Sequence, residues 1–277
     1  MKALLETLEP GSRDHILARS LDPSRLPAHI GVIMDGNGRW ASRRFLPRVA
    51  GHRAGVDSVR MAVETCAEAG IEVLTLYAFS IENWKRPRAE VETLWRLLHY
   101  YLGQELDRLL RNNVRLKAIG RVAALPAVVL KELQAAIDAT ASNTGLTLNL
   151  AINYGGRTEI VDAVNALVDE ARHAGTLDRL EVTEEAIGRH LYTAGQPEPD
   201  LLIRTSGEMR ISNFLLWQGA YSELYVTDTC WPDFSRTELL EALADYQRRD
   251  RRFGGLRGAP GESKASDIAE AVSLPTP

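Results

Sequence analysis

The chain has 277 residues, of which 45% are hydrophobic and 25% are charged, and its formal net charge is −4. These totals suit one large α/β domain, and the lack of an overall positive charge excludes general nucleic-acid binding. Two cysteines, Cys66 and Cys230, are too few for a disulfide framework or a cysteine-based zinc site, and no apolar run approaches a membrane span. We therefore expect a soluble cytoplasmic protein, to which any lipid substrate must come.

Residues 1–27 contain a weak helical pattern interrupted by Pro10-Gly11 and Pro23, which predicts a surface extension. A folded domain is expected over residues 28–256, with no linker that divides it. The sequence after Gly258 is rich in Pro, Gly, Ser and Ala, so a disordered tail is predicted for residues 257–277.

The apolar run 30–34 predicts a buried parallel strand that ends abruptly at Asp35. Gly36, Asn37 and Gly38 follow, and they allow a ligand to approach the backbone closely. A helix beginning near Arg39 would direct its free N–H groups at this loop, which suits a phosphate. A carboxylate beside a diphosphate requires a cation between them, so Mg²⁺ is implied. A simple strand-to-helix turn with an aspartate cap is the alternative interpretation.

Residues 43–53 hold four arginines and one histidine around a proline and a glycine. This composition favours an anion clamp over a helix face, because guanidinium groups match phosphate oxygens. A solvated basic loop is the alternative for this segment.

Hydrophobic periodicity predicts further helices over residues 55–70, 88–112, 127–141, 160–171 and 182–191. Between them, strands are predicted over residues 71–79, 114–119, 146–153, 200–204 and 223–226. A capping box at Ser235 and Glu238 predicts the start of a last helix. This alternation indicates an α/β fold, a single domain with a mostly parallel central sheet flanked by helices.

The helix over residues 88–112 carries an apolar stripe that includes Val91, Leu94, Trp95, Leu98 and Leu102. Such a stripe is usually part of a core. It could equally form one wall of an apolar tunnel, and the sequence leaves both interpretations open.

A second anion-binding feature follows the strand 200–204, where Arg204, Arg210 and Ser212 surround a glycine turn. Neither anion-binding segment matches a dinucleotide fingerprint or a Walker loop. Two diphosphate sites, the separated carboxylates Asp35 and Glu223, and a long apolar helix suit an enzyme that joins two diphosphate esters with apolar tails.

Three segments, residues 29–41, 79–87 and 202–214, closely resemble the signature segments of cis-prenyltransferases and occur in that family's order. The chain lacks the aspartate-rich runs of trans-prenyltransferases. The resemblance implies a hydrophobic tunnel beside a parallel sheet, a homodimer and a requirement for Mg²⁺.

The resemblance also implies roles for single residues. Asp35 and Glu223 match the metal-associated carboxylates, and Asn83 matches the residue proposed to assist proton removal. A neutral amide has no useful basicity, so a diphosphate oxygen is the alternative proton acceptor. The implied substrate-binding residues are Gly36, Asn37, Gly38, Arg39, Trp40, Arg48, His52, Ser80, Ile81, Glu82, Trp84, Arg86, Arg204, Arg210, Ile211 and Ser212.

The implied reaction adds isopentenyl diphosphate in successive cis steps to an allylic diphosphate, usually farnesyl diphosphate. The expected product is a polyprenyl diphosphate, namely undecaprenyl diphosphate for the cell-wall lipid carrier, with transient membrane contact for product release. A shorter product is an alternative, because Trp95, Tyr100 and Tyr101 are bulky. A non-catalytic partner subunit and a phosphate-binding protein are weaker alternatives.

Overall fold

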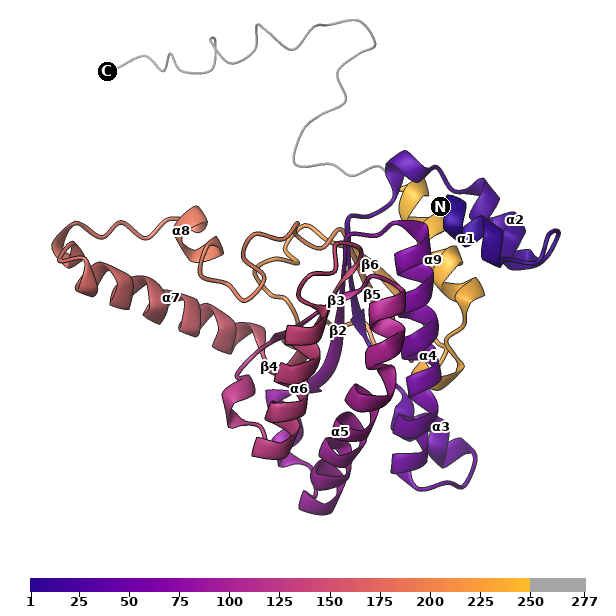
Figure 1. Ribbon diagram of the computed structural model, residues 1–277, viewed down its shortest axis with the longest axis horizontal. Coiled ribbons are helices and arrows are strands. Elements are labelled where there is room, and N and C mark those ends of the chain that lie inside the picture. The colour runs from indigo at the N-terminus through magenta and orange to yellow at the C-terminus, as the bar shows by residue number, and fades with distance from the viewer. Residues whose placement is uncertain (250–277) are drawn as a thin grey trace, which may run out of the picture.

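A six-stranded, entirely parallel sheet forms the centre of the protein, as a computed structural model that describes residues 1–249 shows (Figure 1). Its strand order is β3-β4-β2-β1-β5-β6. The strands are β1 (His29–Ile33), β2 (Val73–Ser80), β3 (Arg115–Ile119), β4 (Thr147–Tyr154), β5 (Leu201–Thr205) and β6 (Glu223–Thr227). The predicted α/β fold is confirmed, whereas the predicted tail at 257–277 lies outside the described residues.

Nine α-helices are found in the part of the chain that the structure describes. They are α1 (Lys2–Thr7), α2 (Arg13–Ser20), α3 (Asn37–Arg43), α4 (Arg48–Ala69), α5 (Arg88–Arg111), α6 (Ala127–Thr140), α7 (Gly156–His173), α8 (Glu184–Gly188) and α9 (Arg236–Arg248). Local sequence explains several ends. Gly70 caps α4 in the left-handed region at φ 88°, and the capping box of Ser235 and Glu238 opens α9 as predicted.

The basic segment 43–53 is not one loop, because α4 begins at Arg48 rather than near Gly55. Pro47 precedes the first turn, where the fixed φ of proline suits a helix start. Gly51 lies inside the helix, and a Cβ there would come within 2.0 Å of the carbonyl oxygen of Asn37. This glycine therefore permits close packing of α4 on the first residue of α3 and does not break the helix.

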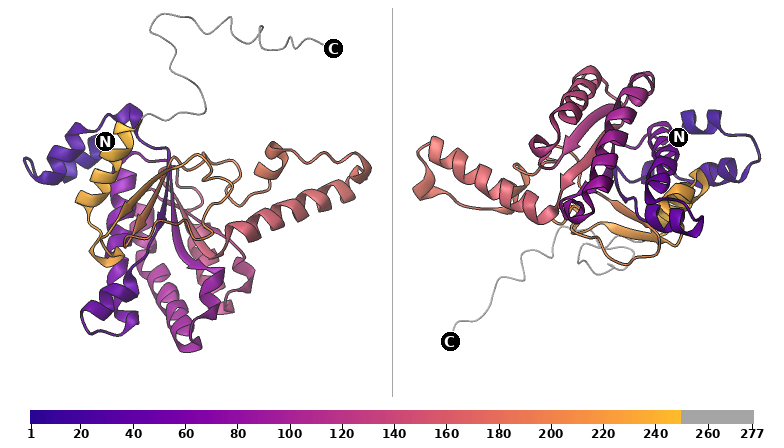
Figure 2. Two further views of the ribbon diagram at one scale, coloured as in Figure 1. Left: turned by 180° about the vertical axis from the view of Figure 1, so that it is seen from behind. Right: turned by 90° about the horizontal axis from the view of Figure 1, so that it is seen from below.

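The two faces of the sheet are covered differently (Figures 1 and 2). Helices α4, α5 and α6 cover one face, where most of the buried apolar side chains form a single cluster. Irregular segments cover much of the other face, around the fully buried Phe214 and Leu215. The helical face therefore has room for a cavity between long elements, and the loop face carries the residues that follow β5.

The N-terminal segment packs on the body of the protein, because Leu4 is fully buried and α2 lies against α9. Helix α7 projects away from the sheet with α8 returning beside it (Figure 1). Within residues 1–249, none of the helices has the length and apolar character needed to cross a membrane.

Candidate active site

Strand β1 lies between β2 and β5, which the chain reaches by connections that leave in opposite directions. Ligands of open α/β sheets bind at such a switch point, outside the carboxyl ends of the strands. Asp35 follows β1 at this point. The fold thus places the carboxylate predicted from the sequence where the two signature loops can meet.

A cavity of about 340 Å³ extends from Asp35 between α4, α5 and the sheet. Its volume falls in the range of small-molecule sites. Apolar side chains of both helices and the strands line its interior, among them Val59, Val63, Leu76, Leu94, Trp95, Leu98, Leu102 and Leu148. Both interpretations of the α5 stripe therefore hold for different residues, since Val91 is buried without lining the cavity.

The polar end of the cavity, here called the mouth, is lined by Asp35, Asn37, Arg48, His52, Asn83 and Arg86. Asn37 Oδ1 and His52 Nε2 are buried there without a hydrogen-bond partner in the described structure. Burial, reinforced by the nearby positive charge of Arg86, lowers the pKa of His52 to about 4. The mouth thus presents a neutral imidazole and unpaired polar atoms, with which a ligand can form hydrogen bonds.

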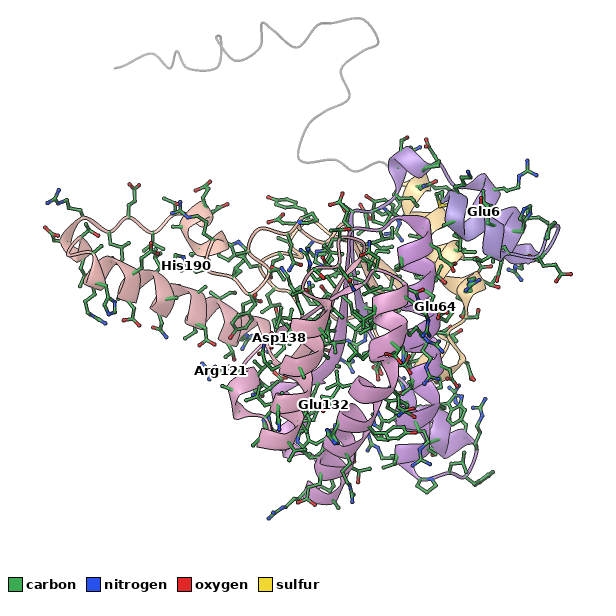
Figure 3. All side chains as sticks on the ribbon, viewed as in Figure 1. Glu6, Glu64, Arg121, Glu132, Asp138 and His190 are labelled. Atoms are coloured by element: carbon green, nitrogen blue, oxygen red, sulfur yellow. The ribbon has the colours of Figure 1, made fainter. Side chains whose placement is uncertain are left out.

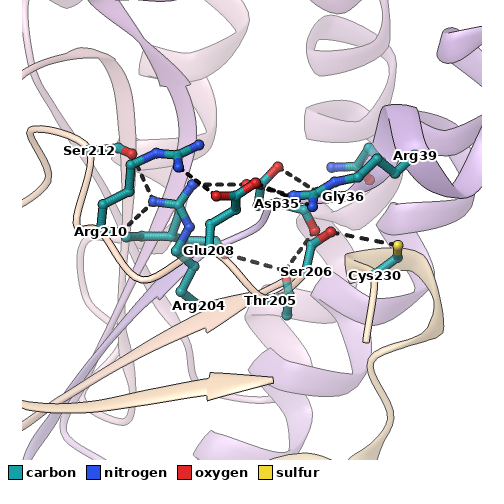
Figure 4. Close-up of polar contacts among 12 residues, drawn as sticks. Asp35, Gly36, Arg39, Arg204, Thr205, Ser206, Glu208, Arg210, Ser212 and Cys230 are labelled. Carbon is teal, nitrogen blue, oxygen red and sulfur yellow. Dashed lines mark hydrogen bonds and ion pairs between the residues drawn. The ribbon is translucent and has the colours of Figure 1, made fainter. Parts of the chain in front are cut away.

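Asp35 is bound by cationic and backbone donors (Figure 4). Its Oδ2 accepts hydrogen bonds from Arg204 at 2.9 Å and from Arg39 at 3.2 Å. Its Oδ1 accepts from the backbone N–H of Gly36 at 2.7 Å, and Gly36 holds a φ of 98°. A Cβ on Gly36 would come within 2.7 Å of Ser206 Oγ, so this turn requires glycine for both conformation and space.

The loop after β5 continues the charged network. Arg204 is buried and also donates to the carbonyl oxygen of Arg210 and to Ser212 Oγ, the latter at 2.7 Å. Glu208 lies 2.5 Å from Arg210 and 3.4 Å from Arg39, so it joins the two predicted diphosphate sites. Arg39, Arg204 and Arg210 outnumber Asp35 and Glu208 in this network, and the surplus positive charge suits an anionic ligand.

The donor set at Asp35 fits Mg²⁺ held jointly with a ligand. Mg²⁺ is usually bound by one or two carboxylates together with substrate phosphates and water. No cluster of three or more His, Cys, Asp or Glu side chains that could hold a metal alone occurs within residues 1–249. Asp35 is a partly exposed carboxylate beside arginines that can take phosphate, which matches the shared mode of binding.

Several predicted residues lie in the turn that follows β2. Asn83 Oδ1 accepts from the backbone N–H of Ser80 at 3.1 Å, which orients the amide that lines the cavity. Trp84 donates to Asn153 at 2.8 Å and packs beside Trp95. Arg86 pairs with Glu90 at 3.1 Å, and Arg48 lies 3.8 Å from the same carboxylate.

The structure does not bring every predicted residue to the mouth. Trp40 donates to Asp233 at 2.7 Å, stacks under Arg44 and does not line the cavity. Glu223 begins β6 at the opposite end of the sheet from Asp35 and pairs with Arg249 at 2.9 Å. The metal role of Glu223 therefore remains a prediction that no contact among residues 1–249 supports.

Sequence reasoning missed two connecting residues, Glu208 and Asn213. The Asn213 amide donates to Glu82 at 3.0 Å, and its oxygen accepts from the backbone N–H of Arg157 at 2.9 Å. Asn213 thereby ties the turn after β2 to the loop after β5. Both residues belong to the signature segments, but nothing in the segments alone indicates which partner each one finds.

A further group of charged residues lines the cavity away from the mouth and joins α4 to α5; we call it the seam. Arg60 pairs with Glu105 at 2.5 Å, and Arg108 pairs with Glu64 at 3.0 Å and with Glu105 at 3.5 Å. Figure 3 labels Glu64 on α4. The seam closes the wall of the cavity with charges that are paired to one another.

A prenyltransferase family model, that of undecaprenyl diphosphate synthase, matches residues 33–254. An isoprenyl transferase of Heliobacterium mobile is 54% identical over 244 residues, which is 88% of this chain and 94% of that protein. An isoprenyl transferase of Clostridium tetani is 52% identical over 236 residues, covering 85% of this chain and 92% of that protein.

Two crystal structures share the fold. Lavandulyl diphosphate synthase from Lavandula x intermedia, in complex with dimethylallyl diphosphate, has a TM-score of 0.81 and 35% identity over 84% of this chain and all of that one (100%). A probable undecaprenyl diphosphate synthase from Campylobacter jejuni has a TM-score of 0.69 and 33% identity over 83% of this chain and 99% of that one.

Proposed function

Since the chain belongs to the undecaprenyl diphosphate synthase family of prenyltransferases, we propose that it extends an allylic diphosphate by successive cis additions of isopentenyl diphosphate. The observation that carries this proposal is one cavity with an anion-binding mouth and an apolar interior. A diphosphate ester with a hydrocarbon tail matches both parts. The preferred primer is farnesyl diphosphate, and the preferred product is undecaprenyl diphosphate.

The primer diphosphate is proposed to bind at the mouth. The backbone of Gly36, Asn37 and Gly38 lies at the start of α3, and Arg48 comes within 3.2 Å of where a Cβ on Gly38 would be. Arg39 and His52 complete the set. Neutral His52 can donate one hydrogen bond to a phosphate oxygen without the cost of burying a charge.

Isopentenyl diphosphate is proposed to bind beside Arg204, Arg210 and Ser212. Arg210 is exposed and pairs only with Glu208 among the described ion pairs, so its guanidinium can turn to an incoming diphosphate. Support for two neighbouring sites comes from the contact of Asn213 with Glu82, which links their loops. In lavandulyl diphosphate synthase, whose structure contains dimethylallyl diphosphate, the same fold accommodates a prenyl diphosphate.

Asp35 is proposed to hold Mg²⁺ together with the primer diphosphate; when bound, the ion offsets negative charge on the departing diphosphate. Arg39 and Arg204 now neutralise Asp35, and a diphosphate would compete for both guanidinium groups. The exchange would expose the Asp35 carboxylate at the moment when the ligand arrives. Arg39 would then stabilise charge on the leaving diphosphate of the primer, and Arg204 would bind the isopentenyl diphosphate beside it.

The bond changes are those of an allylic substitution. The C–O bond of the primer breaks and its electron pair leaves with the diphosphate, while the carbon joins the terminal alkene carbon of isopentenyl diphosphate. The CH2 group next to the internal alkene carbon then loses a proton, and a new double bond forms between these two carbons. We propose that a diphosphate oxygen takes this proton. Asn83 acts by positioning, because its side-chain oxygen is already bonded to the backbone N–H of Ser80.

The proposed assembly is a homodimer. Strand β6 is the last strand of the sheet, and it exposes Leu224, which is 45% accessible. A sheet edge with no neighbouring strand among residues 1–249 favours association with another chain. Sedimentation of the purified chain tests this proposal, and a monomer at micromolar concentration would contradict it.

The function is tested by incubating the chain with farnesyl diphosphate, labelled isopentenyl diphosphate and Mg²⁺, and sizing the products by chromatography. We expect a ladder that ends at a long polyprenyl diphosphate and that disappears when the metal is chelated. A product with one or two added units would indicate the shorter-chain alternative. No condensation with any allylic primer would contradict the proposal and favour a non-catalytic subunit.

A further inference from the structure

The connection between α3 and α4 places a large aromatic residue where helices usually place glycine. The N–H of Phe45 donates to the carbonyl of Ser42 at 3.1 Å, and the N–H of Leu46 donates to that of Ala41 at 2.9 Å. These two bonds form the Schellman motif that ends a helix. Phe45 holds its left-handed position with a φ of 56°, which disfavours a bulky side chain.

Phe45 gains no packing in return. Its side chain is 98% exposed, the largest exposed fraction among the large hydrophobic residues described, and Leu46 beside it is 44% exposed. Single exposed apolar residues are common, but an unfavourable backbone conformation and full exposure together call for a function outside the fold. Phe45 does not line the cavity, so it does not serve as a wall of the substrate site.

The segment around Phe45 is rich in arginine, and one of these arginines, Arg44, is paired with Asp233 at 3.2 Å. Residues 36–56 contain five arginines and no acidic residue, in a chain whose formal net charge is −4. All residues from 42 to 48 are exposed, among them Arg43, Arg44 and Arg48. Apolar side chains flanked by arginines are typical of segments that enter the interface of an anionic bilayer.

The position of the α3–α4 connection favours contact with a flat surface such as a bilayer. The α3–α4 connection and the start of α5 are the two parts that project furthest at the carboxyl end of the sheet (Figure 1). The mouth of the cavity is lined by residues of α3, α4 and the turn before α5. A surface that touches both projections would therefore face the mouth.

We propose that the α3–α4 connection, with Phe45 and Leu46 inserted between basic residues, docks the protein on an anionic phospholipid surface with the mouth toward the lipid. The choice of a lipid partner rests on the proposed function, because a polyprenyl diphosphate must pass from the cavity into a bilayer. The exposed aromatic residue supplies the apolar contact, and the arginines supply attraction to phosphate headgroups.

The test is binding of the full chain, without substrates, to sedimented vesicles of equal parts phosphatidylglycerol and phosphatidylcholine, compared with vesicles of phosphatidylcholine alone. We expect binding to the anionic vesicles that weakens when salt is raised to 0.5 M, where screening shortens electrostatic interactions. Phe45→Gly should weaken this binding about tenfold, since a buried aromatic ring supplies at least that factor.

Phe45→Gly is not expected to destabilise the protein, so a loss of vesicle binding cannot be attributed to unfolding. Glycine suits a positive φ, so the thermal midpoint should stay the same or rise, and condensation of soluble substrates should stay near the parent rate. The matched control is Ile16→Ser, which removes another exposed hydrophobic side chain (61%), on α2 at the other end of the molecule, and should bind vesicles like the parent.

Any of three vesicle-binding results would overturn the proposal: equal binding to both kinds of vesicle, unchanged binding by Phe45→Gly, or an equal loss in Ile16→Ser. A change of oligomeric state in Phe45→Gly would also overturn it and identify the connection as an interface between copies. If the chain catalyses condensation but does not bind vesicles, the docking proposal is wrong and the proposed function stands. If the chain binds vesicles but does not catalyse condensation, the proposed function is wrong and the docking result stands.

Discussion

The mouth and the seam lie on the same cavity, but of the two only the mouth has buried side-chain polar atoms without a partner in the described structure. At the mouth, Asn37 Oδ1 and His52 Nε2 are buried without a partner in the described structure. At the seam, Glu105 accepts from Arg60 and lies beside Arg108, which also pairs with Glu64. Both regions connect long elements, and both are rich in charge.

This difference indicates that the mouth binds a ligand and that the seam holds the wall of the cavity together. An unpaired buried polar atom costs free energy that a ligand can recover, whereas a paired one stabilises the fold and has little to offer a ligand. The mouth is therefore expected to respond to substitution in catalysis and binding. The seam and the apolar wall are expected to respond in stability and in the size of the product.

The largest effect is expected at Asp35. Asp35→Asn keeps the size of the side chain but removes the charge that would hold Mg²⁺, so kcat should fall on the order of a thousandfold. The thermal midpoint should stay close to that of the parent, because the carboxylate is partly exposed.

Asp233→Asn is the control for Asp35→Asn, since Asp233 binds Trp40 and Arg44 nearby without lining the cavity. Near-normal condensation by Asp35→Asn, or an equal loss in Asp233→Asn, would show that Asp35 has no special role.

The next effect concerns the apolar wall. Trp95 and the partly buried Leu98 line the cavity, whereas Val91 on the same helix is as buried as Trp95 but lies outside the cavity. Truncating a large buried side chain to alanine costs about 2–5 kcal/mol of unfolding free energy, so midpoints should fall. If Trp95 and Leu98 limit the growing chain, their alanine variants should also make longer products.

Val91→Ala provides the comparison, because it should lower the midpoint and leave the product unchanged. Chromatographic sizing beside thermal unfolding distinguishes the two outcomes. Unchanged products in all three variants would assign α5 to the core alone. The two bulky tyrosines considered in the sequence analysis have different positions. Tyr101 lines the cavity, whereas Tyr100 does not line it and is 58% exposed.

Much of this architecture could be predicted, because strands and helices carry their own periodicity. The strand before Asp35, the stop of α4 at Gly70 and the capping box at Ser235 all lie where the sequence indicated. The start of α4 at Arg48 could not be predicted, because Gly51 serves the approach of another backbone, which no local pattern reveals.

The charged partners could not be assigned for a similar reason. Glu105 and Arg108 are spaced for a pair within one helix, yet Arg60 and Glu64 on α4 complete the seam. Spacing along a helix predicts neighbours on that helix only. Which residue of α4 pairs with a given residue of α5 depends on how the two helices pack, and the local sequence does not predict this packing.

His52 gives a pH test of the mouth. Its pKa falls from about 6.5 unfolded to about 4 folded, chiefly through burial, so only the unfolded state binds the proton in between. The unfolding free energy should therefore be intact above pH 6.5 and fall toward pH 4, by up to about 3 kcal/mol from this group.

His52→Gln should flatten this fall when denaturant unfolding is compared at pH 7.5 and pH 4.5. Part of the fall should persist, because His29 is buried with a pKa also lowered to about 4. Inorganic diphosphate should protect the parent more than the variant. An identical pH dependence in both proteins would show that His52 is not held neutral by the fold.

Arg210 tests whether a second anion site lies beside the one at the mouth. Arg210→Ala should raise the KM for isopentenyl diphosphate roughly tenfold to a few hundredfold, with little change for the primer. The control is Arg172→Ala, because both arginines have 61% exposed side chains and each pairs with one carboxylate. Equal losses of affinity for both substrates would contradict the division into two sites.

The smallest effect is expected at the seam. Glu105→Gln removes the charge shared by Arg60 and Arg108 while keeping the side chain's volume. Partly exposed ion pairs contribute at most about 1 kcal/mol each, so the loss of stability should be small. Neither KM should change, because the seam offers the diphosphates no unpaired group.

Product size is the measurement that tests whether the seam limits the length of the product. A weaker link between α4 and α5 should let the wall open for a longer hydrocarbon, so Glu105→Gln should shift the product distribution upward. Glu92→Gln is the control, since Glu92 pairs only with Arg88 of α5 among the ion pairs of residues 1–249. A raised KM in Glu105→Gln would place the seam with the mouth and end the distinction between them. An identical product distribution in both variants would reduce the seam to an ordinary contact between two helices.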